Sequence, residues 1–134
     1  MVFEILLSMA AWASLPLRLA LGVAFVFHGY PKLFGPGAKQ TRDYMKTVGV
    51  PPLLTTLTAL LELLGGIALV IGFLTPIVGI LIAFEMVATT FLSKAKLQKK
   101  SMLGYELDIA YLAMALALVV LGGGPTSLDT LLGL

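Results

Sequence analysis

The sequence predicts an all-α fold: an integral-membrane four-helix bundle with a short amphipathic interfacial helix between spans one and two. Hydrophobic residues make up 59% of the 134 residues and charged residues only 12%, whereas soluble domains carry roughly 25% charged residues. The mean hydropathy of +1.02 agrees with this. Four separate stretches are apolar over a length close to the ~20 residues that cross a bilayer.

The expected spans cover residues 12–29, 53–73, 77–92 and 105–122. Short connections join them, so residues 1–134 are expected to form a single membrane domain. The stretch before the first span contains Glu4 and neither Lys nor Arg, which differs from the basic start of a cleavable signal peptide. We therefore expect this stretch to be a short lead-in or interfacial segment.

The first span carries cationic residues along one face. In the segment R-L-A-L-G-V-A-F-V-F-H-G-Y-P-K, at ~100° per residue, one narrow arc holds Arg18, Gly22, Phe25, Gly29 and Lys32, with His28 at its edge. Because the rest of the chain is so apolar, this glycine-notched face is expected to point into the bundle. The Tyr30-Pro31 pair favours an extended or turn geometry, which predicts that the span ends near Gly29.

The connection over residues 34–52 is expected to hold the interfacial helix. It opens with the turn sequence F-G-P-G, after which apolar residues recur at helical spacing against Lys39, Arg42 and Lys46. That pattern indicates a helix of about three turns lying in the interface plane; a solvated loop is the alternative. Gly49 and the proline pair at 51–52 are expected to end it.

Spans two and three each contain an acid. Glu62 shares a face with Thr55, Thr58 and Gly66. Small and hydroxylated residues let membrane helices approach closely, so Glu62 is expected to lie against another helix. Glu85 lies in the middle of span three. The uncharged residues 72–76 predict a tight turn, which makes these two spans an antiparallel hairpin.

Span four begins with G-Y-E-L-D, which places Glu106 and Asp108 at its entrance. Residues two apart in a helix point ~200° apart, so these two acids are not expected to face the same partner. The G-G-G-P sequence at residues 122–125 ends the helix, and Ser127 is expected to cap a short final turn.

The distribution of basic residues predicts the topology. The first connection is bordered or occupied by Lys32, Lys39, Arg42 and Lys46, and four lysines occupy the third connection. The positive-inside rule then places both long connections in the cytoplasm and both termini outside, in a multi-pass protein of the cell (plasma) membrane. The lipid bilayer is the expected partner because of the four apolar spans. A net charge of +2 is too small to suggest nucleic acid.

The charges inside the spans need partners, because an ionised residue at a helix centre costs roughly 2.5 to 3.5 kcal/mol. We expect two groups: Arg18, Glu62 and Glu85 near the midplane, and His28, Lys32, Glu106 and Asp108 near the cytoplasmic boundary. These seven residues form the candidate ligand-binding or buried polar cluster, and no catalytic residue is singled out. Structural alternatives stay open, such as an Arg18–Glu62 pair that sets helix register or a Lys32 that reaches lipid headgroups.

Residue content excludes several chemistries. Cysteine is absent, which removes disulfides, thiol redox chemistry and cysteine-ligated iron–sulfur clusters. One histidine with scattered carboxylates predicts no metal site, and no P-loop, dinucleotide fingerprint or nucleophile triad is found. We therefore expect no cofactor within the chain, so that any electron transfer needs a separate carrier.

Five motifs follow one another along the chain: R-L-x-L-G-x-x-F-x-x-H-G-Y-x-K at 18–32, G-V-P at 49–51, E-L-L-G-G with G-F-L-T at 62–75, G-Y-E at 104–106, and G-x-x-S-L-D at 124–129. In this order they resemble the DoxX family of small four-helix membrane proteins. The resemblance implies four spans and a polar signature of Arg18, His28, Lys32, Glu62 and Glu106. It also implies a link to quinones, since the family is named after a subunit of an archaeal quinol oxidase.

Two hypotheses about function follow. The first is a quinone-associated redox component, or accessory subunit, of a membrane oxidoreductase. A quinone ring needs a flat apolar slot and one or two donors, which the notched face with His28, Lys32 and Glu106 offers, and a partner redox subunit would complete electron transfer. The second is a non-enzymatic assembly or structural protein, or a transporter of protons or a small solute. Hydropathy does not separate the two.

Overall fold

The computed structural model describes residues 1–92, 95 and 105–134, and every regular element in these ranges is a helix. The elements are α1 (Val2–Ser8), the 3-10 turn η1 (Ala10–Trp12), α2 (Ser14–Leu33), α3 (Pro36–Thr47), α4 (Pro52–Ile71), α5 (Thr75–Leu92), α6 (Tyr105–Leu121) and α7 (Leu128–Leu132). The predicted all-α fold is confirmed. The four lysines of the third connection, at 94, 96, 99 and 100, lie outside the described residues.

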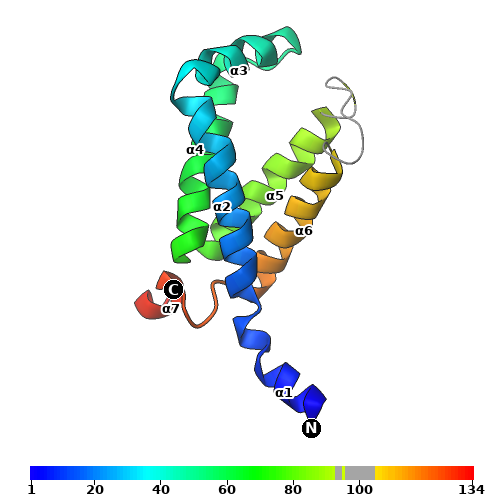
Figure 1. Ribbon diagram of the computed structural model, residues 1–134, viewed down its shortest axis with the longest axis vertical. Helices are drawn as coiled ribbons and strands as arrows, with labels where there is room; N and C mark the ends of the chain where they lie inside the picture. The colour runs from blue at the N-terminus through cyan, green and yellow to red at the C-terminus, as the bar shows by residue number, and fades with distance from the viewer. Residues whose placement is uncertain (93–94, 96–104) are drawn as a thin grey trace.

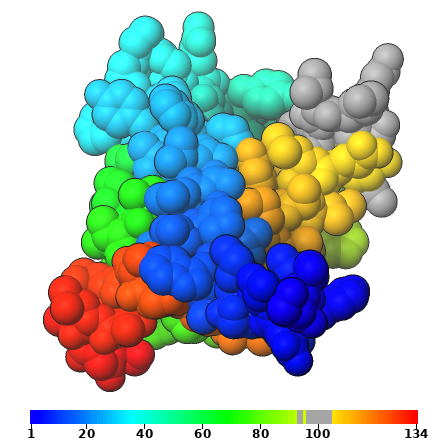
Figure 2. Space-filling view, turned by 60° about the horizontal axis from the view of Figure 1, so that its bottom comes forward, coloured from blue at the N-terminus to red at the C-terminus, as the bar shows by residue number. Residues whose placement is uncertain are grey.

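The long helices form two antiparallel pairs. Helix α2 packs along α4 and α5 packs along α6, while smaller α4–α5 and α2–α6 contacts join the pairs (Figure 1). Helix α3 packs on α2 and α4 at one end of the molecule, and both chain termini lie at the other. Figure 2 shows the two terminal segments on the same side, α1 in dark blue and α7 in red. We call these the α3 end and the terminal end.

Glycines bring α2 and α4 into close contact. A Cβ atom on Gly22 would lie 2.7 Å from the carbonyl oxygen of Gly66, and one on Gly29 would lie 2.5 Å from the backbone nitrogen of Leu63. No side chain fits at these points, so the two backbones touch. The glycine notches predicted for this helix are therefore where α4 packs.

Helix α2 is longer than predicted. It continues past Gly29 and through Pro31 to Leu33, so the expected end near Gly29 is wrong. Pro31 removes one hydrogen-bond donor from the last turn, yet the backbone N–H of Phe34 still reaches the carbonyl of Tyr30 at 3.0 Å. Packing of Gly29 on α4 and the ion pair of Lys32 hold the final turn in place, which local propensity does not anticipate.

Among the residues that the structure describes, three helical stretches are long and apolar enough to cross a membrane: Ala10–Leu33, Pro52–Ile71 and Thr75–Leu92. They correspond to the first three predicted spans. The fourth predicted span is α6, which has 17 residues within the described part of the chain and would extend ~26 Å.

The α4–α5 turn and the last helix follow their local signals. Gly72 ends α4 in the left-handed conformation, with φ 75° and ψ 40°, where glycine is favoured. The hairpin predicted for residues 72–76 is therefore present. Ser127 accepts a hydrogen bond from the backbone N–H of Thr130 at the start of α7, so the predicted cap is confirmed.

Candidate functional site

A cavity of about 440 Å³ is lined by residues of α2, α4, α5 and α6. It opens toward the α3 end, where the α2–α4 and α5–α6 pairs spread apart (Figure 1). We call it the polar pocket. Its lining consists of Phe25, Phe27, His28, Pro31, Lys32, Glu62, Met86, Thr89, Leu107, Asp108 and Tyr111. Four of the seven sequence-predicted site residues lie on this list. The buried members are Phe25, Glu62, Met86 and Asp108, and the last three form its floor. The exposed members, which form its rim, are Phe27, His28, Pro31 and Leu107.

The floor of the pocket is built around one ion pair. Lys32 Nζ lies 2.6 Å from Glu62 Oε1, and the two side chains are 35% and 7% exposed. Lys32 therefore crosses from the end of α2 to the middle of α4 instead of extending freely to lipid headgroups. A hydrogen bond this short between ionised groups is among the stronger polar contacts in proteins.

A second carboxyl group adjoins this ion pair. Glu85 on α5 is 6% exposed and lies beside Glu62, within electrostatic reach of Lys32 and Asp108. Both Glu62 Oε2 and Glu85 Oε2 are buried and have no hydrogen-bond partner among the described residues. Buried acceptors are normally satisfied by a donor, so two such oxygens on neighbouring carboxyl groups indicate that a proton, water or ligand belongs there.

Three aromatic rings form one wall of the pocket. Tyr111 of α6 meets Phe25 and His28 of α2 edge-to-face, with centroids 5.5 and 6.0 Å apart, and Phe25 lies 6.4 Å from His28. These geometries are within the favourable range for aromatic pairs. Sequence reasoning missed Tyr111, although its position one turn after Asp108 puts the two on one helix face.

The two acids at the start of α6 separate as predicted. Asp108 is 8% exposed and lines the pocket, whereas Glu106 is exposed and does not line it. The expected convergence of Glu106 with His28 and Lys32 is therefore wrong, because the ~200° between the two acids turns Glu106 to the outside of the bundle.

Arg18 is the main correction. Its guanidinium does not meet Glu62 or Glu85: Nη1 donates to the carbonyls of Leu69 and Val70 at 3.1 and 3.0 Å, and Nη2 donates to Thr126 Oγ1 at 3.1 Å. Arg18 precedes Lys32 by 14 residues, ~21 Å along the helix, and α4 runs antiparallel to α2. Arg18 therefore reaches the last turn of α4 at the terminal end.

Asp129 completes this second polar site. Its two carboxylate oxygens accept hydrogen bonds from the backbone N–H groups of Leu74 and Thr75 at 2.6 and 2.8 Å. Arg18 thus satisfies carbonyls at the C-terminus of α4 while Asp129 satisfies N–H groups at the start of α5, each with the charge that complements the helix dipole. We call this arrangement the turn clasp, and its bonds account for Arg18 structurally.

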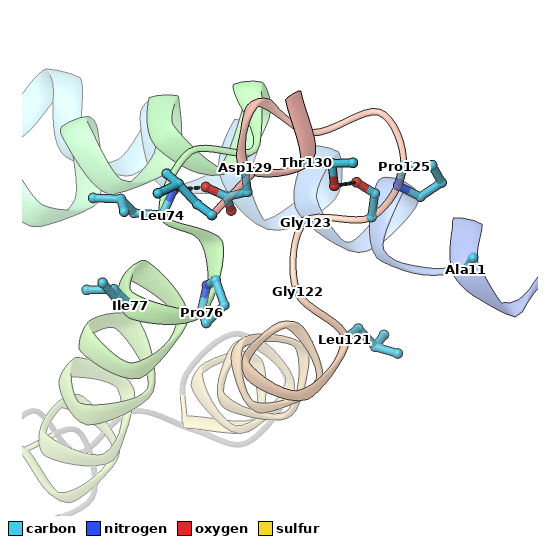
Figure 3. A pocket seen from close by; sticks show the side chains of 12 residues that line it. Ala11, Leu74, Pro76, Ile77, Leu121, Gly122, Gly123, Pro125, Asp129 and Thr130 are labelled. Carbon is cyan, nitrogen blue, oxygen red and sulfur yellow. Dashed lines mark hydrogen bonds between the residues drawn. The ribbon is translucent and has the colours of Figure 1, made fainter. Parts of the chain in front are cut away.

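A larger cavity, about 690 Å³, lies at the terminal end between α5, α6 and the loop leading to α7 (Figure 3). Figure 3 shows Asp129 turned toward Leu74 and Thr130 toward the loop. These polar groups already have hydrogen-bond partners in the fold, and the remaining lining is mostly apolar. The larger cavity therefore has fewer polar groups available to bind a ligand than the polar pocket has.

The polar pocket is suited to a flat, largely apolar molecule with polar ends. Aromatic rings offer stacking surfaces, Lys32, His28 and Tyr111 offer hydrogen-bond donors, and the orphaned carboxyl oxygens offer places for protons. Within the described residues, no group of three or more His, Asp or Glu side chains is placed to hold a metal ion.

Comparisons with known proteins agree with the sequence motifs. The model of the family described as DoxX matches residues 13–95. A Bacillus subtilis (strain 168) protein named "Putative oxidoreductase CatD" is 29% identical over 116 residues, which cover 87% of this chain and 84% of CatD. The Escherichia coli (strain K12) protein named "Inner membrane protein YqjF" is 30% identical over 116 residues, 86% of this chain and 88% of YqjF. No solved structure matches the chain.

Proposed function

Because this chain belongs to the DoxX family of membrane proteins, we propose that its polar pocket binds the ring of a quinone and that the protein is a quinone-associated component or accessory subunit of a membrane oxidoreductase. The observation that carries the proposal is the group of charges at the aromatic-walled pocket: Lys32 and Glu62 line it, and Glu85 lies beside Glu62. Glu62 Oε2 and Glu85 Oε2 are both buried without a hydrogen-bond partner among the described residues. The name of the similar protein, "Putative oxidoreductase CatD", points in the same direction.

The aromatic wall would hold the ring. Tyr111 and Phe25 are fixed by their edge-to-face contact, so they offer a preformed surface that needs little reordering on binding. Lys32 and the Tyr111 hydroxyl would donate to the quinone oxygens. The Lys32 ammonium carries three N–H groups, and one of them donates to Glu62. The other two would be available to a quinone oxygen.

The carboxyl groups of Glu62 and Glu85 would bind and transfer protons. Two buried acids beside one ammonium avoid a second uncompensated negative charge when a proton stays between them. Reduction of a quinone to a quinol consumes two electrons and two protons. Glu85 and Glu62 would pass protons to the ring oxygens and would then be reprotonated from the α3 end. The two electrons would come from a partner redox subunit, since this chain has no cysteine to hold an iron–sulfur centre.

We also propose the membrane arrangement predicted from the sequence. In it α6 is the fourth span, which α5 supports by packing along its length, and α3 lies in the interface with Lys39 and Lys46 exposed. Both termini are outside and the α3 end faces the cytoplasm of the cell (plasma) membrane. Four crossings agree with the two termini lying at one end of the molecule.

The alternative is a protein without enzymatic function. The turn clasp is a purely structural use of Arg18, and a carboxyl pair that holds a proton also suits a proton or small-solute transporter. Proton flux in liposomes made with the purified protein, absent when Glu85→Gln is used, would favour transport over quinone association.

The direct test is mass analysis of small molecules that co-purify with the protein in mild detergent. We expect a quinone with the native chain and its loss from Glu85→Gln and His28→Ala. Glu106→Gln is the matched control, because Glu106 is exposed outside the pocket, and it should retain the quinone. A folded, ligand-free native protein that also fails to bind added quinone would overturn the proposal.

A further inference from the structure

A third hollow lies on the outside of the α2–α4 pair. This apolar groove has a volume of about 310 Å³ and is lined by Val23, Val26, Phe27, Ile67, Val70 and Ile71. Its lining contains no polar side chain. It lies on the surface that the bilayer would cover, as the exposed fractions of Ile67 and Ile71, 45% and 49%, indicate.

Phe27 belongs to both hollows. It lines the apolar groove and also the rim of the polar pocket, and it is 72% exposed. Along the same edge of α2, at steps of four residues, Val23 lines the groove only and Pro31 lines the pocket only. Residues four apart stack on one helix face, so the groove leads into the pocket over the ring of Phe27. Figure 2 shows part of α2 exposed at the surface between α4 and α6.

The two hollows lie at different depths. Ile67 and Ile71 follow Glu62 by five and nine residues along α4, so they lie ~8 to ~14 Å further from the α3 end. The pocket itself lies near that end: Phe27 is six residues, ~9 Å, from the end of α2. Because Glu62 lies at the middle of α4 and Ile71 is its last residue, a ligand in both hollows would keep its polar part on the α3 side of the span and its apolar part on the terminal side.

That is the arrangement of an amphiphile whose polar ring lies in one half of the bilayer and whose hydrocarbon chain runs across the middle. Resting on the pocket function proposed above, we infer that the ligand is an amphiphile that enters sideways from the bilayer between α2 and α6, with its ring in the polar pocket and its hydrocarbon chain crossing Phe27 into the apolar groove. The exposed rim residues Phe27 and Leu107, 72% and 40% exposed, form the entrance. A free, water-soluble ring compound is then a poorer ligand than one with a chain.

The test uses a benzoquinone with a ten-carbon chain that carries a photoreactive diazirine near its middle, with the protein in lipid nanodiscs. After illumination, peptide mass analysis should find adducts concentrated on the groove segments of α2 and α4. Ile67→Trp, which fills the groove, should lower that labelling by roughly tenfold, as expected for overfilling a packed contact. Ile80→Trp is the matched control, since Ile80 is a 55% exposed isoleucine that lines neither hollow.

A short-chain, water-soluble benzoquinone in excess identifies the source of the labelling. If the ring anchors the chain, this competitor should abolish groove labelling. Labelling that resists the competitor would mean that the groove takes up acyl chains in general, and labelling spread evenly over the lipid-facing helices would mean that it takes up none; both outcomes overturn the inference.

The pocket proposal is tested separately. The short-chain compound should raise the unfolding temperature of the native protein. Stabilisation by that compound together with even labelling contradicts only the binding of the hydrocarbon chain in the apolar groove. No stabilisation and no adducts contradict the binding of the quinone ring in the polar pocket.

Discussion

Lys32 of α2 and Glu62 of α4 are joined by a 2.6 Å contact between Nζ and Oε1. They are 30 residues apart in sequence, and Glu62 is buried while Lys32 is partly exposed. The pair fixes the α3 end of the α2–α4 interface, as the turn clasp of Arg18 and Asp129 fixes the terminal end. Each of these contacts leads to a measurable expectation.

Replacing Lys32 should destabilise the protein through Glu62. Lys32→Met leaves a buried carboxyl group without its cation, and we expect a loss of about 1–3 kcal/mol in the free energy of unfolding in detergent. The value falls below that of a fully buried pair because the Lys32 side chain is 35% exposed.

The double variant Lys32→Met/Glu62→Gln should recover part of that loss, because it removes the stranded charge. Lys39→Met, an exposed lysine on α3, is the control and should change stability by less than about 0.5 kcal/mol. Equal effects of Lys32→Met and Lys39→Met would show that the ion pair contributes nothing.

Enlarging Gly29 should separate α2 from α4. A methyl group at this position meets backbone atoms of Leu63 and Ala59 at 2.5 and 2.8 Å, which cannot move independently of their helix. We expect Gly29→Ala to cost about 1–3 kcal/mol of unfolding free energy and to weaken ligand retention in the pocket.

Gly37→Ala is the control substitution for Gly29. The nearest atom to its new methyl group would be the carbonyl oxygen of Pro31 at 3.6 Å, an ordinary contact. Because alanine favours a helix over glycine, stability should stay the same or rise by up to about 1 kcal/mol. A stable Gly29→Ala protein would mean that the close packing of α2 on α4 is not required.

Removing the guanidinium of Arg18 should affect folding and not ligand binding directly. Arg18→Met leaves the carbonyls of Leu69 and Val70 without a side-chain donor and deprives Asp129 of a cation nearby. We expect a loss of about 2–4 kcal/mol, from buried polar groups left unsatisfied.

The protein that remains folded in the Arg18→Met preparation should bind a quinone as well as the native chain does. Arg42→Met on α3 is the control for loss of positive charge. If Arg18→Met had normal stability but no longer bound a quinone, the structural role of Arg18 would be contradicted. Arg18 would then belong to the ligand-binding site.

Tyr111 should contribute to ligand binding through both its ring and its hydroxyl. Tyr111→Phe keeps the edge-to-face contacts with Phe25 and His28 and should weaken quinone binding by roughly fivefold, the value of one hydrogen bond. Tyr111→Leu should weaken it further. Tyr44→Phe, an exposed tyrosine on α3, should leave it unchanged. If neither Tyr111 variant changed quinone binding, the aromatic wall would not be part of the binding site.

Single cysteines test the topology, because the native chain has none. In intact cells, a membrane-impermeant thiol reagent should label Glu4→Cys, and it should label Lys39→Cys only after permeabilisation. Labelling of both positions in intact cells would place the α3 end outside, and it would contradict four crossings with cytoplasmic basic connections.

The elements of the fold were determined by local sequence patterns. The length of the apolar stretches located the long helices. Gly72 marked the end of α4 and Ser127 marked the start of α7, because each of these signals acts over a few neighbouring residues. The same patterns showed that Glu62 faces another helix and that Glu106 and Asp108 diverge.

Tertiary structure alone decided which charges meet. Arg18 and Lys32 lie on the same face of α2, so either could serve Glu62 as far as one helix shows. The choice depends on the axial register of α4, which the contacts of Gly22 with Gly66 and of Gly29 with Leu63 determine. That register places Glu62 opposite Lys32 and places the C-terminal end of α4 opposite Arg18. A register is a property of two surfaces that fit together, and no single helix carries it.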